Sequence, residues 1–246
     1  MTASGGSRAW RRAGGWELAV PVALAVVAGF VDAVGFSRVF GVFPANQSGN
    51  VIFLGMALGG SPGVPDAWRS ALAIVSFAVG TAAGLVISRR VSARRRHSVL
   101  LAVEFALLSA LAVVAGPIST DLVMDGPLSA VLLVLAGVAM GVQTDVISRL
   151  AGVGMSTTYQ TGALTHIAQA VVGLVDRGFA DTPRRAHRLS LGVLSTVFGA
   201  YLFGAVVGAG PGRSAWALFV PPIVVVVLGL ASWRWPVAES TDDHTA

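Results

Sequence analysis

The chain contains neither cysteine nor lysine, and it has few charged residues of any kind. The absence of cysteine excludes disulfides, thiolate nucleophiles, iron–sulfur clusters and zinc sites built from cysteine. All 17 lysine or arginine positions hold arginine, so a Schiff-base lysine and a phosphate-loop lysine are excluded as well. Charged residues make up only 12% of the chain, against about 25% in soluble domains. So few charges cannot cover a water-facing surface, and we therefore expect a membrane protein.

Long apolar runs take the place of the missing charge. Hydrophobic residues form 54% of the chain, and the mean hydropathy is +0.76. About 20 apolar residues cross a bilayer, and the runs long enough to do so are Trp16 to Phe36, Ser70 to Ser88, Ser98 to Gly116, Pro127 to Ile147, Leu189 to Ala209 and Ser214 to Trp235. Two shorter runs, Ser48 to Gly60 and Thr161 to Val175, have lengths that favour re-entrant or buried helices. The prediction is an all-α polytopic membrane protein with about six transmembrane helices and two short re-entrant half-helices.

A single membrane domain, residues 16 to 236, is expected between two short polar ends. Residues 1 to 15 form a basic segment, and residues 237 to 246 form an acidic tail that we expect to be disordered. A basic stretch before an apolar run also begins a signal peptide. Because further apolar runs follow, an uncleaved first helix is favoured.

The arginines distinguish two topologies. If every apolar run crossed the membrane, the arginines would be divided almost evenly between its two sides. If the two short runs dip in and return, all but Arg38, Arg69 and Arg213 lie on the side of the N-terminus. Cytoplasmic loops carry an excess of basic residues, so we expect the second topology, with both termini cytoplasmic in a bacterial inner membrane. This placement also accounts for the net charge of +5, and no nucleic-acid partner is expected.

The two halves of the chain resemble each other. Asp32 aligns with Asp145, Gly41 with Gly154, and Gln47-Ser48-Gly49 with Gln160-Thr161-Gly162. At a longer offset, Phe77 to Gly84 resembles Tyr201 to Gly208. These matches predict a repeat of about 16–116 and 127–235. Each half would hold three spans and one dipping run, so the second half would be an inverted copy, a construction that recurs in transporters.

Three segments of the sequence are similar to a known family. They are GFVDAVGF at 29–36, ANQSGN at 45–50 and TTYQTGALT at 157–165. Together they resemble the YoaK family of bacterial integral membrane proteins, over about Leu18 to Trp235. Ser48 stands where that family often has threonine, which keeps the hydroxyl. The resemblance implies a polytopic helical protein without an established activity.

Polar residues around the two short runs form the candidate binding site. Ser48 and Thr161 are good N-cap residues, and Gly49 and Gly162 allow close backbone approach. A helix start inside the membrane leaves N–H groups unpaired and attracts an anion or a carbonyl oxygen. The alternative is that each cap serves only its own helix. The predicted substrate-binding residues are Asp32, Asn46, Gln47, Ser48, Gly49, Asn50, Asp145, Gln160, Thr161 and Gly162.

Asp32 and Asp145 lie at or near the ends of apolar spans, before the two short runs. Because an ionised carboxylate is costly inside a membrane, each should face a cavity, accept hydrogen bonds or hold a proton. One interpretation is that both line the solute site. A second is that each accepts N–H groups from the start of its short helix and fixes the break. A third pairs Asp145 with Arg149, four residues on.

Glu104 and His166 are candidates for a proton relay. Glu104 lies within the run Ser98 to Gly116, where an acidic residue is unusual. The alternatives are an ion pair between Glu104 and the arginines 94–96, and an ordinary interior role for His166, which shares a helix face with Gln169. The histidines lack metal-ligand spacing, and nucleophile, phosphate-loop and dinucleotide motifs are missing. We therefore expect no metal, no cofactor and no enzymatic activity.

Small residues and prolines predict how the spans meet. The pairs Gly80/Gly84, Gly137/Gly141 and Gly204/Gly208 form small-xxx-small faces for helix contacts, and such faces would also suit a homodimer. Pro221-Pro222 predicts a kink in the last span.

The leading hypothesis is a small-solute transporter or channel whose site lies mid-membrane, at two half-helix N-termini. The competing hypothesis is a non-transporting membrane scaffold or partner subunit. The charge of the solute stays open, because helix starts favour an anion or a carbonyl group whereas two aspartates favour a cation or a proton.

Overall fold

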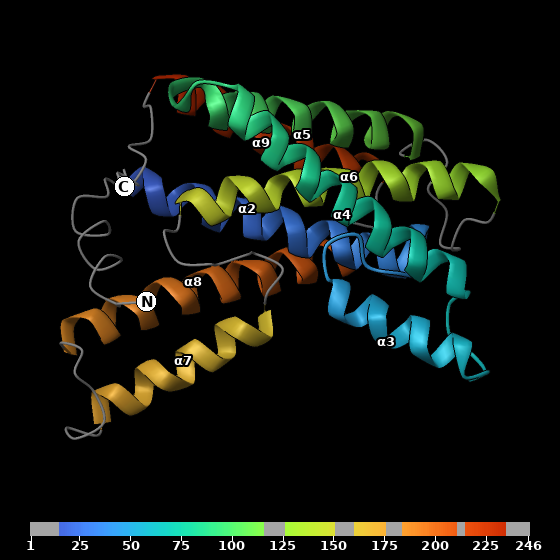
Figure 1. Cartoon of the computed structure of the whole chain (residues 1–246), viewed down its shortest axis with the longest axis horizontal. Helices are drawn as coiled ribbons and strands as arrows, with labels where there is room; N and C mark the ends of the chain where they lie inside the picture. The colour runs from blue at the N-terminus through green and yellow to red at the C-terminus, as the bar shows by residue number, and fades with distance from the viewer. Residues whose placement is uncertain (1–14, 116–125, 151–159, 176–183, 211–214, 235–246) are drawn as a thin grey trace.

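The described part of the chain is built from helices. The computed structural model describes residues 15–115, 126–150, 160–175, 184–210 and 215–234, and these contain no strand. In chain order the helices are α2 (Gly15–Val34), the π-helix η1 (Gly35–Val39), α3 (Gln47–Leu58), α4 (Ala67–Arg90), α5 (Ala93–Ala115), α6 (Pro127–Leu150), α7 (Gln160–Val175), α8 (Arg184–Ala209), the 3₁₀ helix η3 (Ala215–Phe219) and α9 (Val220–Arg234). Figure 1 shows the longer helices lying roughly along one direction. Most of the basic segment, the acidic tail and Gly154 lie outside the described residues.

Five of these helices are long and apolar enough to cross a membrane: Leu18–Val39, Ala67–Arg90, Ala93–Ala115, Pro127–Ser148 and His187–Ala209. A further apolar helix, Ala217–Ser232, is shorter. In lipid every backbone polar group must be satisfied within its own segment, which makes a helix the natural state of an apolar run. The predicted all-α membrane fold is therefore confirmed.

The prolines 221 and 222, where a kink was predicted, lie next to a change of helix type. The last apolar run is divided into η3 and α9, and α9 begins at Val220. Both prolines therefore lie in the first turn of α9. A proline is tolerated there because its missing N–H has no partner within the helix.

Two pairs of parallel helices form the centre of the molecule. Along α8, Gly204 faces Val26 of α2 and Gly208 faces Phe30, so the two helices run in the same direction. The α4·α6 pair repeats this arrangement: Gly80 faces Val138 and Gly84 faces Val142. The apolar core lies between these pairs and α5, with fully buried side chains that include Leu24, Leu101, Leu108 and Met140.

Glycine is required where these helices touch. A Cβ atom at Gly204 would lie 2.9 Å from the Cα of Val26, and one at Gly80 would lie 2.7 Å from the Cα of Val138. At Gly141 a Cβ would lie 2.6 Å from the backbone nitrogen of Thr81. The prediction that the glycine faces serve helix contacts is confirmed. Because these faces are filled within one chain, they offer no surface for a homodimer.

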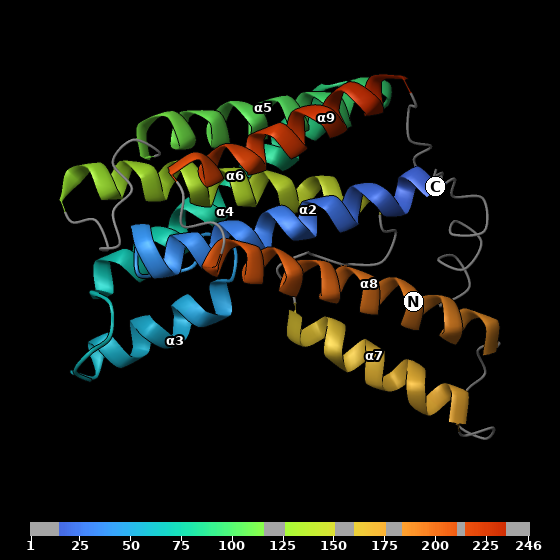
Figure 2. The same cartoon turned by 180° about the vertical axis from the view of Figure 1, so that it is seen from behind.

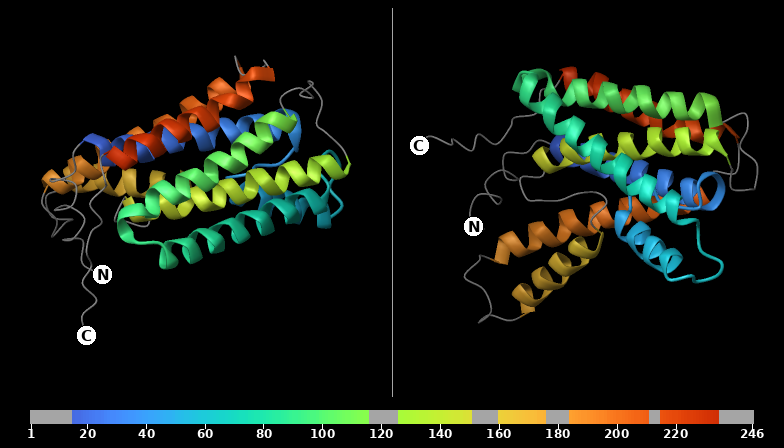
Figure 3. Two further views of the ribbon diagram at one scale, coloured as in Figure 1. Left: turned by 90° about the horizontal axis from the view of Figure 1, so that it is seen from above. Right: turned by 45° about the vertical axis from the view of Figure 1, so that its right-hand side comes forward.

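The remaining helices cover two opposite sides of the four central ones. On one side α5 and α9 lie against each other, and on the other side α3 contacts α4 while α7 contacts α8 (Figures 1 and 2). Each short helix begins toward the middle of the molecule, and the two run to opposite ends (Figures 1 and 3).

Candidate functional site

The carboxylate of Asp32 joins three parts of the structure. Its Oδ1 accepts the backbone N–H groups of Ala45, at 2.6 Å, and of Asn46, at 3.3 Å. Its Oδ2 accepts the hydroxyl of Tyr201, on α8, at 2.5 Å. Asp32 is only 2% exposed. Hydrogen bonds to a carboxylate contribute about 1.5–3 kcal/mol each, so Asp32 holds the chain before α3 against α2 and α8, as the second interpretation of this residue expects.

The loop before α3 is also held by Asn50, from inside the helix. The Oδ1 of Asn50 accepts the N–H of Phe43 at 3.0 Å, and its Nδ2 donates to the Phe43 carbonyl oxygen at 2.6 Å. The same Nδ2 donates to Gln47 Oε1 at 2.9 Å, and Gln47 Nε2 donates to the Pro44 carbonyl oxygen at 2.9 Å. Asn50 and Gln47 therefore fix the loop from within the first turn of the helix.

The predicted N-cap role of Ser48 is wrong. The N-cap residue of α3 is Asn46, which makes no side-chain cap bond. Ser48 lies within the helix, is exposed, and donates to Asn46 Oδ1 at 2.8 Å. The helix begins earlier than expected because Asp32 and Asn50 fix the preceding loop over longer distances in the chain.

Gly49 allows a close approach, although a side chain rather than backbone lies against it. A Cβ atom there would be 2.9 Å from Cδ2 of Phe43. Phe43 in turn stacks with Phe36, with ring centroids 4.7 Å apart, and with Phe53, at 5.9 Å. The sequence analysis missed this stack, because its three rings come from different segments and share no periodicity.

Asp145 joins α6 to α4. It is 3% exposed and accepts a hydrogen bond from the hydroxyl of Ser88. Ser88 was not among the predicted residues, but it continues the face of Gly80 and Gly84 at a spacing of four, which is the signal that would have found it. The side chain of Arg149, the other proposed partner of Asp145, lies outside the described residues.

The helix α7 presents a row of exposed polar side chains. It begins at Gln160, so Thr161 lies within the helix and its predicted N-cap role is wrong. Thr161, Thr165, His166 and Gln169 are all exposed, and we call them the α7 polar stripe. His166 Nδ1 lies 3.1 Å from Gln169 Oε1. The interior role for His166 is therefore wrong.

The two remaining residues predicted on α7 are more enclosed. Gln160 is half-buried at the first position of the helix, and Gly162 is buried. The accessible polar groups at this helix start are therefore those of the α7 polar stripe.

Glu104 is fully buried, and among the described residues neither of its carboxylate oxygens has a hydrogen-bond partner. The ion pair between Glu104 and the arginines 94–96, which was one of the alternatives, is therefore absent among the described residues. Those arginines lie in the first turns of α5, roughly two or more turns away along the same helix. Glu104 belongs to α5 and His166 to α7, two helices that lie on opposite sides of the molecule (Figure 1), so the structure does not bring the two proposed relay residues together.

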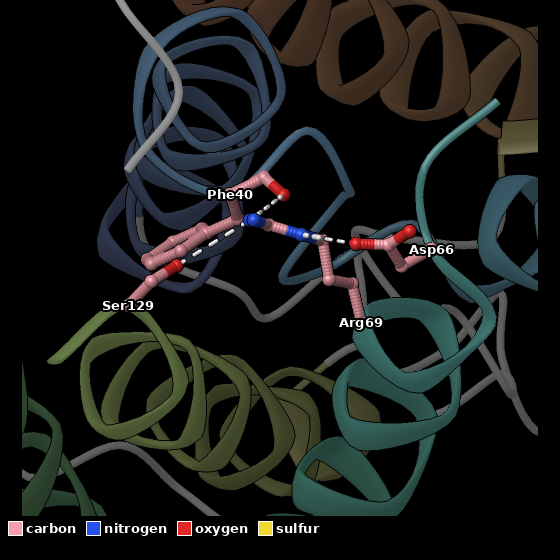
Figure 4. Close-up of polar contacts among 4 residues, drawn as sticks. All are labelled: Phe40, Asp66, Arg69 and Ser129. Carbon is pink, nitrogen blue, oxygen red and sulfur yellow. Dashed lines mark hydrogen bonds and ion pairs between the residues drawn. The ribbon is translucent and has the colours of Figure 1, made fainter. Parts of the chain in front are cut away.

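The side chain of Arg69 joins three segments at one end of the molecule, a role that the sequence analysis missed. It is 5% exposed, and its Nη1 donates to the Phe40 carbonyl oxygen at 3.0 Å and to Ser129 Oγ at 3.5 Å (Figure 4). Its Nε lies 3.8 Å from Asp66 Oδ2. The end of η1 and the beginnings of α4 and α6 therefore lie side by side. Gly41, directly after η1, has a φ of +71°, a conformation that favours glycine.

Comparisons with known proteins place the chain in a family. Residues 20–231 match the family described as "Protein of unknown function (DUF1275)". The "UPF0700 transmembrane protein YoaK" of Bacillus subtilis (strain 168) is 29% identical over 153 residues, which cover 61% of this chain and 65% of that protein. No solved structure is significantly similar to this chain. The resemblance to YoaK is confirmed, and the chain belongs to the DUF1275 family and is a membrane protein with several apolar helices.

Proposed function

We propose that the chain is a small-solute transporter or channel with six spans in two inverted halves and a site at mid-membrane. The observation that carries this proposal is the placement of α3 and α7, which begin toward the middle and run to opposite ends (Figure 3). Some of their polar residues, namely Ser48 and the α7 polar stripe, are exposed. Polar groups and irregular backbone at membrane depth are tolerated only in protein or beside water, which favours a water-filled path at these helix starts.

The contacts of Phe40 and Asp32 support a re-entrant α3. Because Arg69 bonds the Phe40 carbonyl, the chain leaves η1 and returns to α4 at the same end of the molecule. Between these points, Asp32 binds Ala45 within the span Leu18–Val39. In this proposal the segment passes inward as loop and returns outward as helix without crossing the membrane.

The central helix pairs support an inverted repeat. If α2 to α5 correspond to α6 to α9, the α4·α6 contact and the α8·α2 contact are the same contact made twice. The glycines aligned in the sequence, Gly80/Gly84 and Gly204/Gly208, fill equivalent places in these two contacts. On this topology both termini and most arginines lie on the cytoplasmic side of a bacterial inner membrane.

The burial and hydrogen bonding of the two aspartates favour a carbonyl-bearing or anionic solute. Asp32 and Asp145 are buried, and both already accept hydrogen bonds from the protein. They are therefore positioning residues in this proposal. The hydroxyls of Ser48 and Thr165 already donate within the chain. The exposed donors left to meet a solute are the amide N–H groups of Gln169, the ring of His166 and the helix starts, which favour a solute with hydrogen-bond acceptors.

Proteoliposomes test this proposal against the scaffold alternative. Purified protein is reconstituted, and uptake of urea, glycerol and acetate is followed by stopped-flow light scattering. We expect faster entry of at least one solute than in protein-free liposomes. Rates equal to those of protein-free liposomes for all three would favour the scaffold.

A matched pair of threonines then tests where the solute passes. Thr165 and Thr196 are both exposed, and each hydroxyl bonds the carbonyl oxygen four residues earlier, at 3.0 and 2.8 Å. Thr165→Val should slow entry several-fold, whereas Thr196→Val should not. Asp32→Asn and Asp145→Asn change the positioning residues, and lost flux at a normal yield of folded protein would favour transport.

A further inference from the structure

A groove of about 750 Å³ lies between α5 and α9, the two helices on the side opposite α3 and α7 (Figure 2). One end of the groove is polar, with the exposed Arg94 and Arg95 and with Ser98. The rest is apolar, with walls that include Ala102, Phe105, Val226 and Leu230. The groove therefore combines a positively charged end with an apolar interior.

The dimensions of the groove fit one leaflet of a bilayer. From Arg94 to Phe105, α5 rises about 16 Å, close to half of the roughly 30 Å hydrocarbon thickness. Gly229 leaves the α9 wall open, since a Cβ there would meet only the Cβ of Leu101, at 3.7 Å. Near the mouth, the hydroxyls of Ser98 and Ser232 lie 3.1 Å apart and tie the two helices together.

We propose that this groove binds one anionic phospholipid, with the phosphate at Arg94 and Arg95 and an acyl chain along the apolar wall. Two guanidinium groups complement a phosphate in both charge and hydrogen bonding. Both arginines also lie in the first turn of α5, where the helix dipole favours an anion. The apolar wall distinguishes a lipid from free phosphate, because only the lipid has a chain to bury.

Native mass spectrometry of the purified protein in detergent provides the test. The protein is titrated separately with dioleoyl phosphatidylglycerol and dioleoyl phosphatidylcholine, and the retained lipid is counted. We expect one phosphatidylglycerol to bind at least about tenfold more tightly than phosphatidylcholine. Millimolar inorganic phosphate should not displace it. Equal binding of the two lipids, or displacement by phosphate alone, would overturn the proposal.

Two variants and a matched control locate the lipid. Arg94→Gln/Arg95→Gln should abolish the preference for phosphatidylglycerol. Gly229→Leu, which fills the groove, should reduce the binding of both lipids. Arg89→Gln/Arg90→Gln removes the same charge from the adjacent end of α4, outside the groove, and should leave the preference intact. An equal loss in the two arginine double variants would mean that only the general charge of this end attracts lipid, and it would contradict a site in the groove.

Discussion

Gly204 lies where α8 approaches α2 most closely, and its substitution has a magnitude that follows from the structure. A Cβ there would lie 2.8 Å from the carbonyl carbon of Val26 and 2.9 Å from its Cα. Carbon atoms in contact are about 3.5 Å or more apart. The carbonyl oxygen of Val26 lies closer still to that Cβ. Gly204→Ala therefore requires the two helices to separate by more than about 0.7 Å, and over-packing of this kind costs about 1–3 kcal/mol.

Gly199 provides the control on the same helix. A Cβ at Gly199 would have no atom within 4 Å. Gly199→Ala removes a glycine from a helix interior, which should raise the free energy of unfolding by up to about 1 kcal/mol. The two alanine variants, identical in chemistry, should therefore change stability in opposite directions.

Thermal unfolding of the purified protein in detergent, followed by tryptophan fluorescence, measures this difference. One kcal/mol shifts the Tm of a protein of about this size by roughly 2–4 °C, so Gly204→Ala should unfold at least about 2 °C below Gly199→Ala. Equal melting temperatures for the two variants would refute the close contact of α2 and α8.

The other predictions concern the hydrogen bonds around α3 and the buried acid of α5, and the same thermal assay measures all of them. A double-mutant cycle of Asp32→Asn and Tyr201→Phe should give a coupling of about 1.5–3 kcal/mol, and a coupling near zero would contradict the bond between them. Asn50→Leu leaves the N–H and carbonyl of Phe43 without these partners and should cost at least about 2 kcal/mol; an unchanged Tm would show that the loop is held by other contacts. Glu104→Leu removes a buried carboxylate without described partners and should raise the free energy of unfolding by about 1–3 kcal/mol; a lower Tm would reveal a partner for Glu104.

The helices of this fold were predictable from the sequence because each apolar run must satisfy its own backbone in lipid. The ends of these helices were less predictable. Arg89 and Arg90 belong to α4, and the arginines 94–96 belong to α5, whereas the first apolar run ends at Ser88 and the next begins only at Ser98. Arginine stems extend along an apolar surface and keep their charge in water, so a helix can continue past its apolar stretch.

The sequence predicted residues that come together at the start of α3, but not their roles there. Asp32, Asn46, Gln47, Ser48 and Asn50 do gather at the start of α3. The N-cap at Ser48 was wrong, because the bonds that set the helix start join residues far apart in the chain, and local patterns do not reveal such bonds.

Arg69 shows the same limit of sequence reasoning. In the sequence it is one arginine among 17 and serves only to mark topology. In the structure it is buried and bonded to the Phe40 carbonyl, 29 positions earlier. Burial of this kind depends on tertiary contacts, which composition and periodicity do not report.

The central claim is that α3 and α7 dip into the membrane from opposite sides without crossing it, and single-cysteine labelling tests this most directly because the chain has no cysteine of its own. Cysteine is placed at the exposed positions Ser37 and Ser61, on either side of α3, and at Arg94 and Arg185. In intact cells a membrane-impermeant maleimide should label the variants at 37 and 61, and it should label those at 94 and 185 only after the membrane is opened. Labelling of positions 37 and 61 from different sides, or of 94 and 185 from different sides, would contradict the inverted architecture and the transport proposal built on it.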